Sequence, residues 1–234
     1  MSVAELAALI RSHQPCVVLT GAGISTESGI PDFRSPTGLW AQFDPLEYGS
    51  IQLFRADPAR VWGFYALRFE ALARAEPNAG HLALAELERR GLVRAVITQN
   101  IDRLHERAGS REVVEVHGSI RTSSCGVCGR RYPLEEVLEL LPLPVCRDDG
   151  TVLKPDVVFF GELLPEDAIA RAYELVHEAE LVLVVGSTLE VHPVAGLPLE
   201  APRFAIVNVG PTALDRRAAL RVEGKAGEVL PALL

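Results

Sequence analysis

The chain lacks an apolar segment long enough to cross a membrane, and it lacks an excess of positive charge. No run approaches the roughly 18 uninterrupted apolar residues of a transmembrane helix. The opening stretch MSVAELAALIRSHQP carries one arginine and no small-residue cleavage site, unlike a secretion signal. Thirty-one acidic against 23 basic residues give a net charge of −8, which disfavours broad binding to nucleic acid. We therefore expect a soluble, cytoplasmic protein that binds neither membranes nor nucleic acid.

Cysteine is scarce, and its spacing indicates a metal site more than disulfides. Cys125 and Cys128 form one Cys-x-x-Cys pair, and Cys146 follows after 17 residues. A structural zinc site of this spacing ordinarily has a second pair, but Asp149 occupies the place of its last cysteine. Either Cys125, Cys128, Cys146 and Asp149 hold a structural zinc ion, or this part of the chain has lost its metal. Cys16 opens an apolar run, where a small buried thiol is expected.

Short apolar, β-branched runs alternate with amphipathic helical patterns along the chain. The helical patterns include residues 79–91 and 165–180. Strands that are apolar at nearly every position need both faces of their sheet covered, so this alternation predicts an α/β fold with a doubly wound parallel sheet. The predicted strands are 16–21, 94–100, 112–118, 180–187 and 204–210.

Two stretches, 36–76 and 121–154, break this alternation. The first contains an aromatic-rich helical pattern and the second contains the cysteines, prolines and turns. We interpret 36–76 as a helical insertion and 121–154 as a zinc-ribbon-like insertion. Together they form a smaller lobe, with a ligand-binding cleft where it meets the sheet. The larger domain would then comprise residues 1–35, 77–120 and 155–234.

The segment VVLTGAGISTESG, residues 17–29, leads from an apolar strand into a glycine-rich turn. Such a turn presents backbone N–H groups to a pyrophosphate. The fingerprint of redox dehydrogenases requires glycine at the first, third and sixth positions, which here are Gly21, Gly23 and Thr26. No acidic residue closes a second strand about 20 residues later. These departures argue against a redox enzyme, and from this stretch alone a tight turn without a ligand is also possible.

Five motifs occur in a set order: GAGISTESGIPDFR, TQNID, VHGS, KPDVVFFGE and GSTLEVHP, at 21–34, 98–102, 116–119, 154–162 and 186–193. Together they resemble the sirtuin family, from about residue 14 to residue 232. This resemblance implies NAD-dependent removal of acyl groups from protein lysines, with NAD consumed and nicotinamide and O-acyl-ADP-ribose released. It also implies a Rossmann-like large domain and a small zinc-bearing lobe.

The resemblance assigns roles to individual residues. His117 matches the catalytic base, and Asn100 matches the residue that orients the ribose and the catalytic water. Asp102, with the backbone of Ile101, matches the group that binds the carboxamide of nicotinamide, and Phe33 matches the ring that shields the reacting carbon. The other positions that match cofactor contacts are Gly21, Ala22, Gly23, Ser25, Glu27, Asp32, Arg34, Gln99, Gly186, Ser187, Thr188, Asn208, Val209, Gly210 and Ala226.

Simpler interpretations exist for the polar members of this set. A lone histidine is more often a structural hydrogen-bonding residue than a base, and only the motif favours catalysis for His117. Asp102 could cap the helix that follows it. We assign structural roles to the remaining histidines, His13, His81, His105, His177 and His192.

Residues 157–162 and 189–193 resemble the two edges between which an acyl-lysine peptide lies as an added strand. Tyr65 and Arg68 stand three residues apart on one helix face, an arrangement that resembles the sirtuin branch that removes succinyl and malonyl groups. Arginine offers a two-pronged donor to a carboxylate, and the tyrosine hydroxyl adds another. Alternatively, Arg68 pairs with Glu70 or Glu135 while Tyr65 only packs.

The loop GISTESGIPDFR is more similar to that of plain deacetylases, so acetyl groups are expected substrates as well. Two other functions use the same pocket: transfer of ADP-ribose, and non-catalytic sensing of NAD or ADP-ribose. Joint presence of His117, Asn100 and Asp102 argues against a sensor, which has no use for a base.

Overall fold

The computed structural model describes all residues except 1, 34–37, 39–40, 42–43 and 45–47. Arg34, which matches a cofactor contact, therefore lies outside the described residues. A six-stranded sheet forms the centre of the larger part, in the order β3-β2-β1-β7-β8-β9, and every neighbouring pair is parallel. Its strands are β1 Cys16–Thr20, β2 Ala95–Thr98, β3 Val113–Glu115, β7 Leu181–Val185, β8 Phe204–Asn208 and β9 Leu220–Glu223.

The predicted α/β class is confirmed, and each of the five predicted apolar runs contributes a strand. The sixth strand, β9, was missed. It is an edge strand in which buried Leu220 and Val222 alternate with less buried residues, so its four residues do not form an apolar run. A short alternating stretch of this kind is a weak signal beside the buried central strands.

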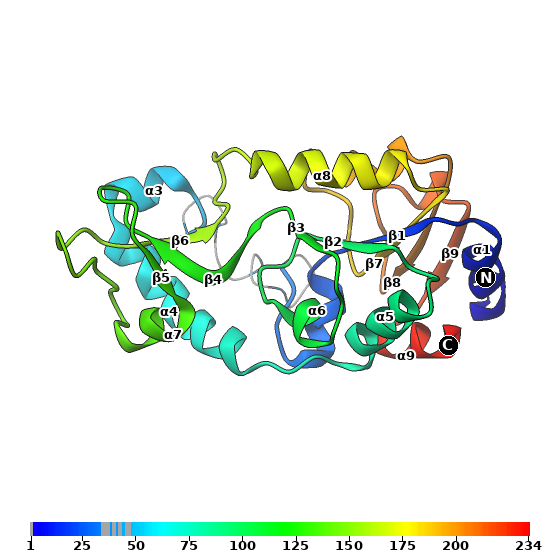
Figure 1. The fold of residues 1–234 in the computed structure, drawn as a ribbon, viewed down its shortest axis with the longest axis horizontal. Helices are drawn as coiled ribbons and strands as arrows, with labels where there is room; N and C mark the ends of the chain where they lie inside the picture. The colour runs from blue at the N-terminus through cyan, green and yellow to red at the C-terminus, as the bar shows by residue number, and fades with distance from the viewer. Residues whose placement is uncertain (1, 34–37, 39–40, 42–43, 45–47) are drawn as a thin grey trace.

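Helices cover both faces of the sheet (Figure 1). Helices α1 (Val3–Ser12), α5 (Ala79–Arg89) and α9 (Ala226–Val229) pack with the 3₁₀ segment η5 (Pro231–Leu233) on one face. On the other lie α8 (Glu166–His177) and η3 (Val194–Glu200). In β1, Cys16 and Val18 face the first core, and Val17 and Leu19 face the second. This explains the unbroken apolar strand, and Cys16 is fully buried as expected.

A second group of elements lies at the other end of the molecule (Figure 1). It contains a three-stranded antiparallel sheet in the order β5-β4-β6. Trp62, Phe69, Tyr132 and Phe159 are the largest side chains of its core, and the indole N–H of Trp62 donates to the Leu153 carbonyl at 2.8 Å. The elements are α3 Ile51–Ala56, α4 Pro58–Arg74, β4 Gly118–Ser124, β5 Arg131–Pro133, α7 Leu134–Glu139 and β6 Lys154–Val157.

The individual elements within residues 121–154 were not predicted from the sequence. Most of β4, all of β5 and α7, and the start of β6 fall in this stretch. These elements are short, between 3 and 7 residues, and β4 is largely polar. Stretches this short show little apolar periodicity, so local pattern gave little indication of them.

The amino end of α5 is joined to the segment that follows β1. The Asn78 side chain caps α5 by accepting from the backbone of Gly80 at 2.9 Å, and its amide donates to the Ile24 carbonyl at 2.7 Å. Ile24 belongs to η1 (Ala22–Ser28), a 3₁₀ helix. The glycine turn is thus fixed both by β1, which precedes it, and by this hydrogen bond from Asn78. Two further short elements are α6 Leu104–Arg107 and η4 Asp215–Arg217.

Across the part of the chain that the structure describes, no helix is long and apolar enough to span a membrane.

Candidate active site

The segments that follow β1, β2 and β7 meet at the carboxyl edge of the parallel sheet, where such folds bind ligands. The Gly23 N–H donates to the Gly186 carbonyl at 2.8 Å, and the Gln99 side chain donates to the Ser187 hydroxyl at 3.0 Å. Gly186 has φ +64°, and a Cβ there would lie 2.3 Å from the Ile24 nitrogen. Only glycine permits this approach, so the turn after β7 packs directly on the turn after β1.

A buried polar cluster lies beneath this junction. The Ser25 hydroxyl donates to the Asp102 carboxylate at 2.7 Å. The Asn100 side-chain amide donates to the Ser25 hydroxyl at 3.1 Å and to the Gly21 carbonyl at 3.2 Å. Burial raises the pKa of Asp102. The structure thus brings Gly21, Ser25, Asn100 and Asp102, all named from the sequence, into one hydrogen-bonded group.

Asp102 also has the capping role weighed from the sequence. Its carboxylate accepts the backbone N–H of Leu104, the first residue of α6, at 2.9 Å. Its two oxygens are therefore divided between the helix start and Ser25.

His117 lies between the end of β3 and the start of β4, at the same edge. Its Nδ1 is 3.1 Å from the Gln99 carbonyl, so Nδ1 carries the proton and Nε2 keeps a lone pair. Burial lowers the pKa of His117 below its usual 6.5. The chain turns at Gly118, where φ is +73° and a Cβ would lie 2.2 Å from the Asp156 carbonyl oxygen. His117 is thus a neutral imidazole that can accept a proton through Nε2.

Further along the edge lie other residues that the sequence predicts to contact the cofactor. Asn208 ends β8, and its amide donates to the carbonyls of Val209 and Gly210 at 3.0 Å. The Glu27 carboxylate accepts the Gly227 N–H at 2.7 Å, next to Ala226 at the start of α9. Other predicted cofactor positions are at or near these segments: Ala22 in η1, Thr188 after β7, and Asp32 and exposed Phe33 in the loop after η1.

Tyr65 and Arg68 lie on α4, against the segment predicted to form one edge of the peptide site. The Tyr65 ring centroid is 5.5 Å from that of Phe159. Burial raises the pKa of Tyr65 to about 12, so its hydroxyl keeps its proton. The Arg68 guanidinium lies 3.4 Å from the Phe64 ring centroid and donates to the Phe64 carbonyl. Glu70, one of the two acidic partners considered for Arg68, lies 3.7 Å from Arg74.

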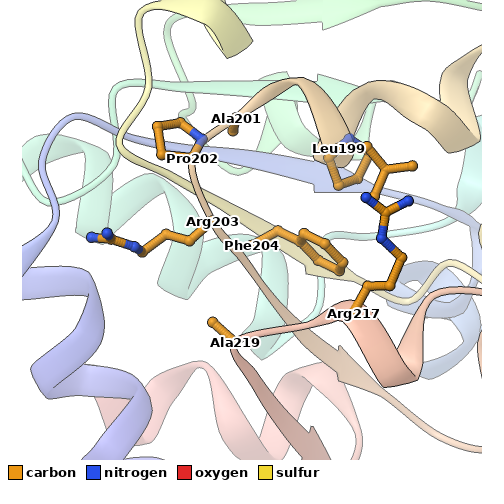
Figure 2. Close-up of a pocket in the computed structure, with 8 residues that line it drawn as sticks. Leu199, Ala201, Pro202, Arg203, Phe204, Arg217 and Ala219 are labelled. Atoms are coloured by element: carbon orange, nitrogen blue, oxygen red, sulfur yellow. The ribbon is translucent and has the colours of Figure 1, made fainter.

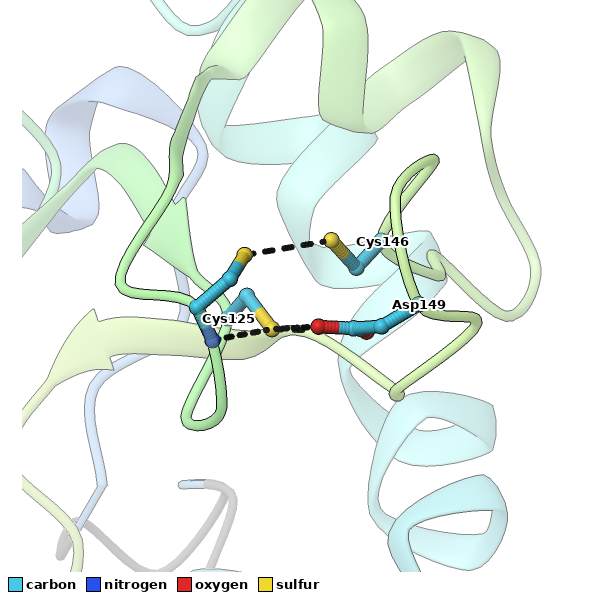
Figure 3. A group of neighbouring side chains, drawn as sticks. Cys125, Cys146 and Asp149 are labelled. Atoms are coloured by element: carbon cyan, nitrogen blue, oxygen red, sulfur yellow. Dashed lines mark hydrogen bonds between the residues drawn. The ribbon is translucent and has the colours of Figure 1, made fainter.

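Three thiols and one carboxylate converge at the tip of the smaller sheet. The ligand atoms of Cys125, Cys128, Cys146 and Asp149 all lie within 4.8 Å of one another. Figure 3 shows Cys125, Cys146 and Asp149 facing one another from two loops. The Cys125 Sγ lies 3.3 Å from the Asp149 Oδ2. Hydrogen bonds from Thr151 lower the pKa of Asp149 to about 2, which keeps its carboxylate ionised. This donor set fits a tetrahedral structural zinc ion.

We predict that the protein retains about one zinc ion after dialysis, and that the Asp149→Ala variant loses it at lower chelator concentrations. Asp149→Cys should hold zinc more tightly than the wild type, because a fourth thiolate replaces a harder oxygen ligand. The measurement is competition with a chromophoric chelator. Asp148→Ala is the matched control, because Asp148 pairs with Arg130 at 2.9 Å instead. Equal zinc retention by Asp149→Ala and wild type would remove Asp149 from the ligand set.

A separate hollow of about 300 Å³ lies at the opposite edge of the sheet, where β8 begins at Phe204 (Figure 2). Since Asn208 ends the same strand, this hollow is one strand length away from the carboxyl edge. Its lining includes none of the residues predicted for the site. The lining residues are Pro198, Leu199, Ala201, Pro202, Arg203, Phe204, Arg217 and Ala219.

A polar layer that was not predicted from the sequence lies directly under the site. Thr20 and Thr98 end β1 and β2, and their hydroxyl oxygens are 2.8 Å apart. His81 and His105 were given structural roles, and they do make hydrogen bonds, to Ser25 at 3.4 Å and to Thr20 at 2.9 Å. A threonine closing each of two otherwise apolar runs was the signal that could have drawn attention to this layer.

The fold and this edge define an α/β nucleotide-binding protein with a neutral histidine beside its ligand-binding turn. The Sir2 family model matches residues 21–193, and the chain belongs to this family. Among its relatives, "NAD-dependent protein deacylase 2" of Pyrobaculum aerophilum is 49% identical over 100% of this chain and 94% of its own length. "NAD-dependent protein deacetylase 1" of Geobacillus kaustophilus is 48% identical, over 92% of this chain and 90% of its own.

Solved structures agree with this assignment. A structure described as "Sir2-p53 peptide-NAD+" superimposes with a TM-score of 0.92 at 40% identity, covering 100% of this chain and 97% of the other. One described as "Sir2 bound to acetylated peptide" has a TM-score of 0.91 at 38% identity, with coverage of 100% and 97%.

Proposed function

We propose that the protein is an NAD-dependent protein-lysine deacylase that releases nicotinamide and O-acyl-ADP-ribose. The observation that carries this proposal is the state of His117. Its Nδ1 is committed to the Gln99 carbonyl and its Nε2 is left as an acceptor, beside the cluster that contains Asn100 and Asp102. A base in this position is needed for a transfer reaction and serves no purpose in a sensor.

When bound, NAD supplies the ribose carbon that the acyl oxygen attacks as nicotinamide departs. His117 Nε2 accepts the proton of a ribose hydroxyl, which activates that hydroxyl. Asn100 uses its amide hydrogens on Gly21 and Ser25, so its Oδ1 can accept from a ribose hydroxyl or a water. Asp102 and the Ile101 backbone would bind the carboxamide of nicotinamide. Phe33 would cover the reacting carbon.

The partners would be proteins or peptides with acylated lysines, bound between residues 157–162 and 189–193 as an added strand. The first of these segments is held in shape locally. The Glu162 carboxylate accepts the Phe159 N–H at 2.8 Å and pairs with Lys154 at 3.0 Å. Backbone recognition on such an edge places little demand on peptide sequence, which suits an enzyme with several protein targets.

We further propose that succinyl and malonyl groups are removed alongside acetyl groups. Arg68 and Tyr65 are close enough for the positive charge of Arg68 to oppose the rise in the pKa of Tyr65. Both residues are on the helix that packs against Phe159 of the peptide segment. A protonated hydroxyl and a guanidinium there would bind the distal carboxylate of an acidic acyl chain.

The structural zinc would hold the tip of the smaller sheet and take no part in the reaction. A cytoplasmic location completes the proposal: none of the four cysteines forms a disulfide, which suits a reducing compartment.

The test is release of nicotinamide from NAD in the presence of acetyl-lysine, succinyl-lysine and unmodified versions of one peptide. The proposed function requires both acylated peptides to drive turnover and the unmodified peptide to give only background. Mass spectrometry should show O-acyl-ADP-ribose in equal amount to nicotinamide. Attachment of ADP-ribose to the peptide or the enzyme, with no loss of the acyl group, would contradict the proposal and indicate an ADP-ribosyltransferase.

A further inference from the structure

A buried chain of hydrogen bonds runs under the sheet edge from His105 to Asn100. His105 Nε2 lies 2.9 Å from the Thr20 hydroxyl, and the Thr20 hydroxyl donates to the Thr98 hydroxyl at 2.8 Å. The Thr98 oxygen also accepts the backbone N–H of Asn100 at 3.1 Å. His105, Thr20 and Thr98 are at most 2% exposed. We call these three residues the Thr–His chain.

The hydrogen bonds of the Thr–His chain all run in one direction, from His105 through Thr20 to Thr98. Thr20 has one hydroxyl hydrogen and gives it to Thr98, so its oxygen must accept from His105 Nε2–H. Within the part of the chain that the structure describes, His105 Nδ1 has no partner, which places the single ring proton on Nε2. Burial lowers the pKa of His105 to about 3, so the ring is neutral. Its neighbour His81, with ring centroids 4.9 Å apart, is also neutral.

Asn100 is held by hydrogen bonds at both its backbone and its side chain. Its backbone N–H is anchored by Thr98, and its side chain is anchored by Gly21 and Ser25. The direction of Oδ1, the atom left for a ligand, is therefore set from both sides. The Thr98 hydroxyl accepts from Asn100, and its own position is fixed by the hydrogen bond from Thr20. Without that bond the Thr98 side chain could rotate about χ1.

We propose that Thr20, Thr98 and His105 are positioning residues for Asn100, which hold its oxygen at the place where the reaction requires an acceptor. This inference rests on the proposed function. The residues of the Thr–His chain lie below the site, and their effect passes through the backbone of Asn100. Misplacement of a reacting or orienting group by about 1 Å costs on the order of 100-fold in rate.

The first test compares Thr20→Val, which keeps the shape but removes the hydroxyl, with Thr20→Ser, which keeps the hydroxyl. We expect Thr20→Val to lower kcat with acetyl-lysine peptide by about 10- to 100-fold, with KM for the peptide changed less than about twofold. Thr20→Ser should restore kcat to within about threefold of the wild type. Val18→Ala, a buried change in the same strand that does not touch the Thr–His chain, controls for lost stability and should leave kcat nearly unchanged.

A cycle with Thr98→Val tests whether the effect is transmitted through Thr98. If the Thr–His chain acts as one unit, Thr20→Val should add little to the loss already caused by Thr98→Val. Fully multiplicative losses would mean that Thr20 acts by another route, and would overturn the proposal.

Nuclear magnetic resonance supplies readouts that do not depend on turnover. The wild type should show His105 as the Nε2–H tautomer, and the Asn100 amide should exchange faster in Thr20→Val than in Thr20→Ser or Val18→Ala. Equal exchange in all three variants, or a Thr20→Val enzyme as active as Val18→Ala, would overturn the proposal while leaving the proposed function intact. A wild type that turns over no acyl peptide would refute the proposed function and, with it, this inference.

Discussion

Replacing His117 with alanine is expected to reduce deacylation by about 10²- to 10⁴-fold, the usual contribution of a general base. The imidazole is held by one bond to the Gln99 carbonyl, so its loss should leave the sheet edge and the Ser25–Asp102 contact in place. NAD binding, measured by calorimetry or by an increase in melting temperature, should survive. The activity measurement is the rate of nicotinamide release with acetyl-lysine peptide.

His177→Ala is the matched control for this prediction. His177 lies on α8 with a side chain that is 57% exposed and 3.7 Å from Glu200, away from the site. Its replacement should leave the rate within about twofold of the wild type. If His117→Ala retained wild-type activity, the assignment of the base would be wrong.

The pH dependence follows from the same residue. A base must be deprotonated, so activity is lost as the pH falls through the pKa of His117. Because burial moves that pKa below 6.5, kcat/KM of the wild type should remain flat through pH 7 and decline only on the acid side of pH 6.5. An acid limb centred above pH 7 would contradict this, since it would require an environment that favours imidazolium.

The second large effect is expected for Arg68→Met. Removing one partner of a desolvated charge pair costs roughly 2–5 kcal/mol, or about 30- to 5,000-fold, so kcat/KM for succinyl-lysine peptide should fall by at least about 30-fold. Acetyl-lysine has no carboxylate to lose contact with, and its kcat/KM should change less than about threefold. Tyr65→Phe should have the same selectivity but a smaller effect, because a single hydrogen bond from an uncharged hydroxyl to a carboxylate contributes only about 1.5–3 kcal/mol.

Arg74→Met is the control for this comparison. Arg74 is on the same helix and pairs with Glu70 at the surface, where an exposed ion pair is worth about 0–1 kcal/mol. It should leave both substrates unaffected. An equal loss of activity on the succinyl-lysine and acetyl-lysine peptides in Arg68→Met would contradict this prediction. It would mean that Arg68 stabilises the helix through its contact with Phe64 and does not bind the acyl chain.

The parts of the fold that could be predicted are those whose signal is local. Val17, Val18 and Leu19 are fully buried on two faces of one sheet, and that requirement appears in the sequence as an unbroken apolar run. Helices α5 and α8 were visible because their apolar residues recur with helical spacing. Strands β5 and β9 were not, because they have only three and four residues and neither contains an unbroken apolar run.

The sequence by itself determined which chemical groups the protein has and in which order they occur: a glycine turn after a strand, Asn100 and Asp102 after a second, His117 after a third, and three cysteines with Asp149. Only the tertiary structure decided which of these groups touch. Thr20 meets Thr98 across 78 residues, and Glu27 meets Gly227 across 200. The physical reason is that motifs record covalent neighbours, whereas hydrogen bonds, burial and the pKa values they set depend on how separate strands are brought together when their apolar faces are buried.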